Sequence, residues 1–191
     1  TLAISKENFN FLSSLNSHMK IPAWPVKNIK IYSDKNTSKE LLEFKAKNKE
    51  NFFLVKYVDI FNSFEQFCKI NKKIKLKKIN YKSKSNKTIL EKNYKLIINS
   101  DKNNNLNYKK VEKNYNAIAY TGILDHEIKK KNNEATQIFT KYGPLAFLPL
   151  SKNKTSIVFS ISNNYKINEK KLFDLIKKYN FNYKIKKISK F

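Results

Sequence analysis

Short apolar segments alternating with polar turns fill the C-terminal part of the chain. Four of these segments have the length of strands, and the polar stretches between them are as short as the turns of an antiparallel sheet. They cover residues 116–127, 134–140, 145–150 and 155–161. We therefore expect four consecutive strands joined as an antiparallel meander. After them, Asn168 can cap an amphipathic helix with Leu172, Leu175, Ile176 and Tyr179 on one face, and a last strand follows.

Two further helices are predicted in the N-terminal part. Ser5 can cap a helix that runs to about Asn16, because apolar residues follow it at helical spacing. Asp59 can cap a second helix, whose apolar face carries Ile60, Phe64, Phe67 and Cys68. Between these helices, Pro22 and Pro25 bracket Trp24 in an irregular connector that cannot be helical.

The remaining apolar patterns are those of strands. Alternation predicts strands at residues 29–32, 74–76 and 79–81, and the apolar stretches at residues 40–44 and 51–58 are two more strand candidates. Tyr94–Ile98 is almost entirely apolar, which is typical of a strand buried on both faces, and residues 101–110 form a polar loop. Strands and helices do not alternate as βαβ units. The pattern therefore predicts an α+β fold, built on a mixed or antiparallel sheet with a few flanking helices.

Length and composition indicate a single folded unit over residues 1–191. A chain of this length with 40% hydrophobic residues can bury a sizeable core. No apolar run approaches the roughly 20 residues that span a bilayer, and the N-terminus lacks the pattern of a signal peptide. The single cysteine, Cys68, excludes an intramolecular disulfide. We expect a cytoplasmic protein, and since both ends look like the interior of a domain, a piece of a longer chain.

All the cations of the chain are lysines. The sequence has 40 Lys and Arg residues, none of which is arginine, and a net charge of +25. A surface that evolved to grip phosphate normally includes arginine, whose planar group makes paired hydrogen bonds. Lys, Asn and Ile share A/T-rich codons, so genomic composition accounts for much of the charge. The lysines follow no single stripe and no RNA-binding motif is present, so no dedicated nucleic-acid partner is predicted.

Few residues have the arrangement of a catalytic site. No glycine-rich nucleotide motif or HExxH zinc motif occurs, and His18 and His126 are far apart without a pair of cysteines. Cys68 falls on the inner face of a helix, where a buried thiol is inert. The cluster Asp125-His126-Glu127 could relay protons or could simply end a strand. We predict no metal site and no catalytic side chain.

One segment retains glycine and proline in a chain that has two glycines and four prolines. It reads FTKYGPLAFLPLS and covers residues 139–151, followed by SIVFS at residues 156–160. These stretches resemble the signature of the ubiquinone-biosynthesis aromatic hydroxylases, which are flavin-dependent monooxygenases related to para-hydroxybenzoate hydroxylase. The His126-Glu127 pair, the N-terminal TLAISKENFNFLSSL and PVKNIKIYSD at residues 25–34 are similar to stretches of that family in the same order.

The resemblance implies an enzyme in which FAD carries out the chemistry, with NAD(P)H as reductant and a polyprenylated aromatic ubiquinone precursor as substrate. It implies that the wall of the substrate and flavin pocket includes Phe139, Gly143, Pro144, Leu145 and Pro149. Residues 1–110 would be a partial remnant of the flavin-binding region, and residues 111–191 would be the substrate domain. Association with a membrane surface or with other hydroxylases is compatible with this family.

The chain also departs from the family pattern. The GxGxxG and GDAAH motifs that hold the dinucleotide are missing. In the middle motif of the family, a strand followed by A-D-G, Asp101 is retained but Lys102 replaces the glycine. The resemblance thus implies that this chain alone binds FAD weakly or not at all and is inactive. Two alternatives remain open: a lysine-rich module that binds polyanions or nucleic acid, and a non-catalytic scaffold derived from the substrate domain.

Overall fold

The computed structural model describes residues 1–15, 21–45, 50–77, 94–96, 98 and 111–190. By the contacts within the chain it divides into two compact units. One unit comprises Thr1–Phe67 together with Tyr115–Phe191, and the other comprises Cys68–Asn114. The predicted division into a flavin-binding remnant (residues 1–110) and a substrate domain (residues 111–191) concerns function and stays a prediction. All strands described below belong to the first unit.

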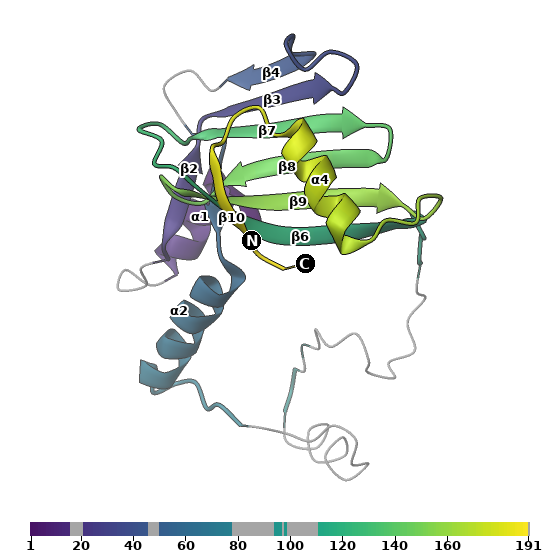
Figure 1. Cartoon of the computed structure of the whole chain (residues 1–191). Helices are drawn as coiled ribbons and strands as arrows, with labels where there is room; N and C mark the ends of the chain where they lie inside the picture. Colours follow the sequence, from purple (N-terminus) through teal and green to yellow (C-terminus); the bar gives the residue numbers. More distant parts are fainter. Residues whose placement is uncertain (16–20, 46–49, 78–93, 97, 99–110, 191) are drawn as a thin grey trace. The chain divides into compact units, whose positions relative to one another are not determined.

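The main element of the first unit is a seven-stranded sheet (Figure 1). Its strand order is β10-β6-β9-β8-β7-β3-β4. All neighbouring strands are antiparallel except β3 and β7, which are parallel, so the sheet is mixed, as predicted. The strands are β3 (Asn28–Ser33), β4 (Leu42–Lys45), β6 (Ala117–His126), β7 (Glu134–Thr140), β8 (Gly143–Pro149), β9 (Lys154–Ser162) and β10 (Ile185–Ile188).

The four predicted C-terminal strands are present, but they do not form a four-stranded meander. Only β7, β8 and β9 follow one another as neighbours, while β6 pairs with β9 and not with β7. The connection from β6 to β7 therefore passes the ends of β8 and β9, and Lys129 in this connection donates its backbone N–H to the carbonyl of Lys152 between those two strands. The meander prediction was wrong because the length of a connection does not determine which strand is the neighbour.

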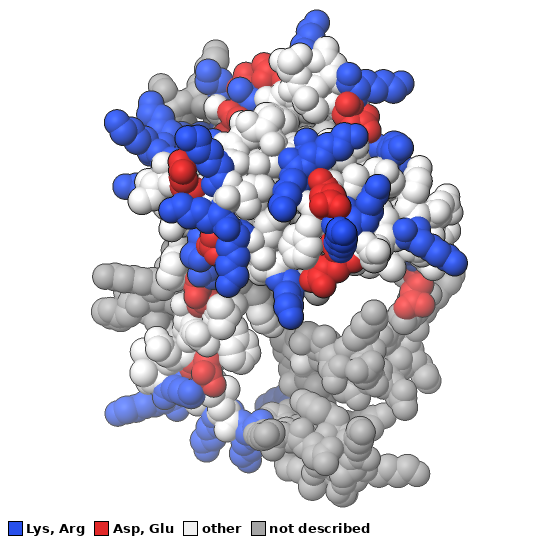
Figure 2. Space-filling view, in the orientation of Figure 1, with Lys and Arg blue, Asp and Glu red and all other residues white. Residues whose placement is uncertain are grey.

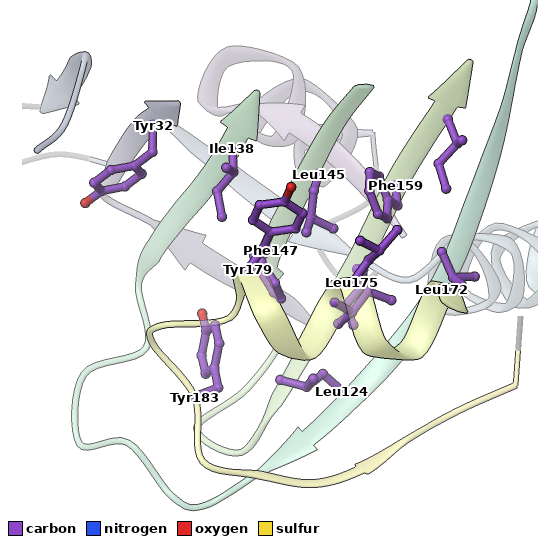
Figure 3. Close-up of a cluster of buried hydrophobic side chains, with 13 residues drawn as sticks. Tyr32, Leu124, Ile138, Leu145, Phe147, Phe159, Leu172, Leu175, Tyr179 and Tyr183 are labelled. Atoms are coloured by element: carbon purple, nitrogen blue, oxygen red, sulfur yellow. The ribbon is translucent and has the colours of Figure 1, made fainter. Parts of the chain in front are cut away.

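Helix α4 (Glu169–Tyr179) covers one face of the large sheet (Figure 1). Asn168 caps it, since its side chain accepts a hydrogen bond from the backbone N–H of Lys171. Leu172, Leu175 and Tyr179 point from the helix onto the strands (Figure 3). The strand residues of this core include Leu124, Ile138, Leu145, Phe147, Ile157, Phe159 and Ile161. The cap and the apolar face of α4 confirm the sequence prediction.

A smaller sheet has the order β1-β5-β2. Its strands are β1 (Leu2–Ser5), β5 (Phe52–Val55) and β2 (Ala23–Val26), and the helices in this part of the chain are α1 (Lys6–Ser14) and α2 (Tyr57–Ile70). Ser5 caps α1 as predicted, through a hydrogen bond from the N–H of Asn8. The predicted irregular connector around Trp24 is instead β2. Because β2 is an edge strand, Pro25 is tolerated there despite its missing N–H.

Other predicted boundaries also need correction. Helix α2 begins at Tyr57, so Asp59 lies in its first turn and is not its cap. Residues 74–76 form no strand. The prediction of a buried strand at Tyr94–Ile98 was wrong, since Tyr94, Leu96 and Ile98 are 53%, 75% and 87% exposed and are not in a strand. An apolar run becomes a buried strand only where another strand lies beside it, and the sequence of the run does not reveal whether one does. The predicted strand at residues 79–81 and the loop at 101–110 lie outside the described residues.

Candidate functional site

The two faces of the large sheet differ in what covers them. Side chains alternate between the faces along each strand. Leu145, Phe147, Phe159 and Ile138 belong to the core beneath α4, so their neighbours in sequence point to the opposite face, which we call the second face. Near one end of β7 the smaller sheet covers the second face, where Ala135 packs with Val26 and Leu54, and with further residues that include Leu148 and Leu150.

A row of side chains crosses the second face beyond the part that the smaller sheet covers. The register of the strands places one residue from each of six strands side by side: Leu42, Ile31, Gln137, Ala146, Val158 and Thr121. Leu42 is 47% exposed, and the central members of the row are half-buried. At the usual strand spacing the row is roughly 24 Å long. Four of its six members are apolar, the amide of Gln137 lies near its centre, and Thr121 places a hydroxyl at one end.

The turn between β7 and β8 lies beside this row and is held by many hydrogen bonds. The hydroxyl of Thr140 donates to the carbonyl oxygen of Gly143 at 2.7 Å and accepts from the N–H of Tyr142 at 3.1 Å. The carboxylate of Asp34 accepts from the N–H of Lys141 at 2.8 Å, which ties the turn to the end of β3. The turn is therefore a fixed border of the second face and not a loose loop.

Gly143 has a backbone conformation that other residues rarely adopt, with φ at +135°. A Cβ atom at this position would lie 2.1 Å from the carbonyl oxygen of Ser160 in β9. The glycine is thus required both by its φ angle and by the close approach of the neighbouring strand. The resemblance implied a pocket role for Gly143, and the geometry gives it a structural role in shaping the turn.

The five residues implied as a pocket wall lie on different sides of the sheet. Phe139 and Pro144 pair across β7 and β8 and point to the second face, where Phe139 is 49% exposed. Leu145 is fully buried beneath α4, and Pro149, which has the same parity in β8, is also buried. Phe139 and Pro144 can therefore contact a ligand on the second face, whereas Leu145 and Pro149 support it from behind. Asp101 lies outside the described residues.

The row around Gln137 was not identified from the sequence. Within EATQIFT, Gln137 and Phe139 have the same parity, which is a signal that both face away from the core formed by Thr136 and Ile138. That Ile31 and Leu42 stand beside Gln137 depends on the pairing of β3 with β7 and β4. The sequence contains no local sign of that pairing.

The second cluster with possible chemistry is the one around His126. His126 is buried, and its Nδ1 lies 2.7 Å from the carbonyl oxygen of Glu127, so Nδ1 carries the proton and donates. Its Nε2 then accepts from the hydroxyl of Thr155 at 3.1 Å. Asp125 pairs with Lys154 and Glu127 with Lys184, so neither carboxylate orients the imidazole. This arrangement ends a strand and does not relay protons.

A network of buried polar groups surrounds His126. Tyr183 donates its hydroxyl to Oδ1 of Asn132 at 3.2 Å, and Nδ2 of Asn132 donates to the carbonyl oxygen of Ser151 at 2.6 Å. No buried side-chain nitrogen or oxygen lacks a partner in the described part of the chain. Burial lowers the pKa of His126 and the nearby Lys129 lowers it further, against the opposing effects of the Glu127 carbonyl and Asp125. The imidazole is therefore a neutral structural group.

The described residues offer few other sites. Within the ranges that the structure describes, no group of three or more His, Cys, Asp and Glu side chains could hold a metal ion. Cys68 is half-buried on α2. No helix among the described residues is both long enough and apolar enough to cross a membrane. Compared with known proteins, the chain matches no protein-family model and no curated protein.

Proposed function

We propose that this chain forms the substrate-side sheet of a flavin-dependent aromatic hydroxylase of ubiquinone biosynthesis. The observation that carries the proposal is the half-buried row on the second face, with the exposed residues Phe139 and Pro144 at its border. These two residues belong to the Gly/Pro-marked segment on which the family resemblance rests. An aromatic ring with an apolar tail would lie along the row, and the ring would contact Phe139.

The chemistry of such an enzyme requires a shaped apolar surface from the protein and little else. When FAD is bound, it supplies the oxygen chemistry, with NAD(P)H as the source of electrons. The wall excludes water from the substrate ring and fixes its orientation. Gln137 is the one amide at the centre of the row, so it can hydrogen-bond a phenolic oxygen while the neighbouring Ile31 and Ala146 contact the ring.

The described residues do not fit the dinucleotide of FAD. Its pyrophosphate needs a glycine-rich turn between a strand and a helix, and the two glycines of this chain lie within β6 and β8. Under the proposal, other parts of the intact enzyme hold the flavin. We therefore assign this chain only substrate contacts, and no step of the reaction to its side chains.

Titration with a long-chain alkylphenol, followed by NMR of the 15N-labelled chain, tests the proposal. We expect shifts of the backbone signals of Gln137, Phe139, Ala146 and Val158, which line the second face. In the Phe139→Asp variant these shifts should be lost at the same ligand concentration, because a carboxylate at this position opposes an apolar ring. Ile128→Asp is the matched control, since Ile128 is 74% exposed and outside the row.

Binding that is lost in Phe139→Asp and kept in Ile128→Asp supports the proposal. The absence of shifts up to the solubility limit of the alkylphenol rejects it and favours a scaffold without a ligand. Shifts confined to α4 and β10 reject the second face as the substrate wall. On the face that Figure 2 shows, lysines are mixed with acidic side chains and form no single stripe, so this face does not have the charge pattern typical of a nucleic-acid-binding surface.

A further inference from the structure

The first half of strand β6 forms an open edge of the large sheet. On this side of β6 the neighbouring strand is β10, which covers only the last part of β6, since Ile188 pairs with Leu124. Just beyond β10, the N–H of Ser189 donates to the carbonyl oxygen of Ile123. Among the described residues, no strand continues this pairing along residues 117–120. This part of β6 is therefore an edge to which a further strand can be added.

The backbone groups of Ala117 and Ala119 point to the open edge. Successive residues of a strand direct their N–H and C=O groups to opposite sides. Ile123 directs both groups to the side of β10, because its N–H donates to the hydroxyl of Ser189 at 2.8 Å and its carbonyl accepts from the N–H of the same residue. Ala117 and Ala119 have the same parity as Ile123. Asn116 has the opposite parity, and its carbonyl accepts a hydrogen bond from the segment after β9.

The open edge lacks the features that usually protect an edge strand. Natural sheets place lysine, proline or a bulge at such an edge, since these oppose pairing with another chain. The chain is rich in lysine, yet residues 114–124 contain no charged residue and no proline. The pairing of β6 with β9 is also continuous, without a bulge. Ala117, Ile118 and Ala119 are exposed. The sequence therefore leaves this edge competent for pairing.

A pocket of about 620 Å³ lies beside the open edge. Its apolar lining comes from both strands of this end of the sheet and from the segment before α4, through Ile118, Tyr120, Ile161, Tyr165 and Ile167. Tyr120 and Ile161 pack with the core beneath α4, so the pocket lies on the face of the sheet that α4 covers. Ile118 has the same parity as Tyr120 and is 54% exposed. The pocket is thus next to the side chains that an added strand would contact.

The segment between β9 and α4 gives the pocket a fixed wall. The ring of Tyr165 packs edge-on against that of Tyr142, with the ring centroids 4.8 Å apart. The N–H of Tyr165 donates to the carbonyl oxygen of Ser162 at 3.0 Å. At the end of the segment, Asn168 caps α4. The pocket is therefore formed before any ligand enters it.

Charge indicates which kind of chain fits this edge. Lys166 lines the pocket and is exposed, and residues 155–168 contain no acidic side chain. A second copy of this chain would also bring an uncharged strand, but two copies with a net charge of +25 each repel one another. An extended segment that carries acidic residues is attracted instead.

We propose that β6 binds an extended, acidic segment of a partner protein, which joins the sheet as a further strand and places an apolar side chain in the pocket. Main-chain pairing provides the affinity in this mode of recognition, and the pocket provides the specificity. The partner residues that pair with Ala117 and Ala119 form the backbone hydrogen bonds. The residue between them lies opposite Ile118 and points to the face of the pocket. Acidic residues two positions before and after it share that face, which Lys166 borders.

This binding site is independent of the substrate proposed above. Ile118 and the pocket lie on the face that α4 covers, whereas Phe139 lies on the second face. The edge of β6 is also at the opposite end of the strand order from β3 and β4. Either proposal can therefore fail while the other stands.

Titration of the 15N-labelled whole chain with a capped peptide, Thr-Asp-Val-Phe-Val-Asp-Thr, tests the proposal by NMR. In an extended peptide the phenylalanine and both aspartates lie on one side. We expect shifts of the backbone signals of Ala117, Ile118 and Ala119. The N–H groups of Ala117 and Ala119 should also exchange more slowly with solvent, because they become hydrogen-bonded. The absence of these changes at about 1 mM peptide overturns the proposal.

Two N-methylated peptides distinguish strand pairing from attraction to a basic surface. Methylation of both valines removes the N–H groups that pair with Ala117 and Ala119. Each hydrogen bond contributes about fivefold to the affinity, so this peptide should bind roughly 25-fold more weakly. The matched control is methylated at both aspartates, whose N–H groups point away from β6, and should bind about as tightly as the parent peptide. Equal losses would mean that the peptide does not pair with β6, and the proposal would be wrong.

Variants of the protein test the pocket. Ile118→Asp places a carboxylate beside the phenylalanine and the aspartates of the peptide and should weaken binding at least about tenfold. Ile128→Asp is the matched control, since Ile128 is 74% exposed and lies in the connection from β6 to β7. Equal binding by these two variants overturns the role of the pocket. Circular dichroism establishes that each is folded, and the methylated peptides keep the test decisive if Ile118→Asp is not.

Hydrogen exchange of the protein without peptide tests the competing occupant. We expect the N–H groups of Ala117 and Ala119 to exchange rapidly at every protein concentration, because no strand pairs with them. Slow exchange that appears as the protein concentration rises would show that a second copy occupies the edge. Slow exchange at every concentration would show that the edge is already paired. Either result overturns the proposal.

Discussion

Replacing Gly143 by alanine tests whether the turn between β7 and β8 needs a glycine. The added methyl group meets two obstacles in the structure. The φ angle of +135° is one that residues with a Cβ rarely adopt. The Cβ would also lie 2.1 Å from the carbonyl oxygen of Ser160, where real contacts are longer than 3.0 Å. The turn and β9 must therefore separate by about 1 Å, or the backbone must rotate.

The expected loss of stability is the sum of these effects. The unfavourable φ costs about 1–2 kcal/mol. Separation of the strands weakens the hydrogen bond from the N–H of Ser162 to the carbonyl oxygen of Tyr142, at 3.0 Å, which is worth about 1 kcal/mol. Disturbed packing around the turn adds a similar amount. We expect a total near 3–4 kcal/mol, which lowers the melting temperature by roughly 10 °C in a chain of this size.

Urea unfolding followed by the fluorescence of Trp24, the single tryptophan, measures this loss. Gly122→Ala is the matched control, because the other glycine of the chain lies within β6 and does not have a positive φ. The control should change the free energy of unfolding by less than about 1 kcal/mol. A loss below 1 kcal/mol in Gly143→Ala would refute the reasoning, since the turn would then accept an ordinary residue.

Three other predictions concern buried or capping groups. The pKa of His126 is lower in the folded than in the unfolded protein, so the free energy of unfolding should have its full value above about pH 6.5 and should fall as the pH drops below that. Urea unfolding at pH 7.5 and 5.0 measures this fall, which should be smaller in His126→Gln than in the wild type. Tyr183→Phe leaves Oδ1 of the buried Asn132 without its donor and should cost about 1–3 kcal/mol by the same assay, and an unchanged stability would contradict the network. Asn168→Ala should lower the unfolding free energy by about 1 kcal/mol, and Asn164→Ala, outside the helix, should not.

The parts of the fold that were predicted correctly depend on local patterns. The strand at residues 134–140 and the helix after Asn168 were recognised because alternation and capping are written in neighbouring residues. The buried strand predicted at Tyr94–Ile98 failed because an apolar run does not say whether another strand lies beside it. The strand at Trp24 was missed because proline excludes a helix and a central strand but not an edge strand.

The candidate site was predicted in part for the same reason. Gly143 and Pro144 stood out in a sequence that is poor in glycine and proline, and they mark the border of the second face. The row through Ile31 and Gln137 could not be found, since it depends on the parallel pairing of two distant strands. The face of the sheet to which Leu145 points became clear only from its neighbours in the core beneath α4.

The pairing of β3 with β7 also has a consequence for the order of folding. The contact of Trp24 with Asn132 closes a separation of 108 residues, and that of Asp34 with Lys141 closes 107. By contrast, β6 to β10 and α4 are continuous in the sequence from Ala117 to Ile188. During synthesis, β3 and β4 leave the ribosome first, and Ile29 and Ile31 of β3 remain without their partner strand until β7 is made. We therefore expect the part of the sheet that is made last to be the template on which the part made first is assembled.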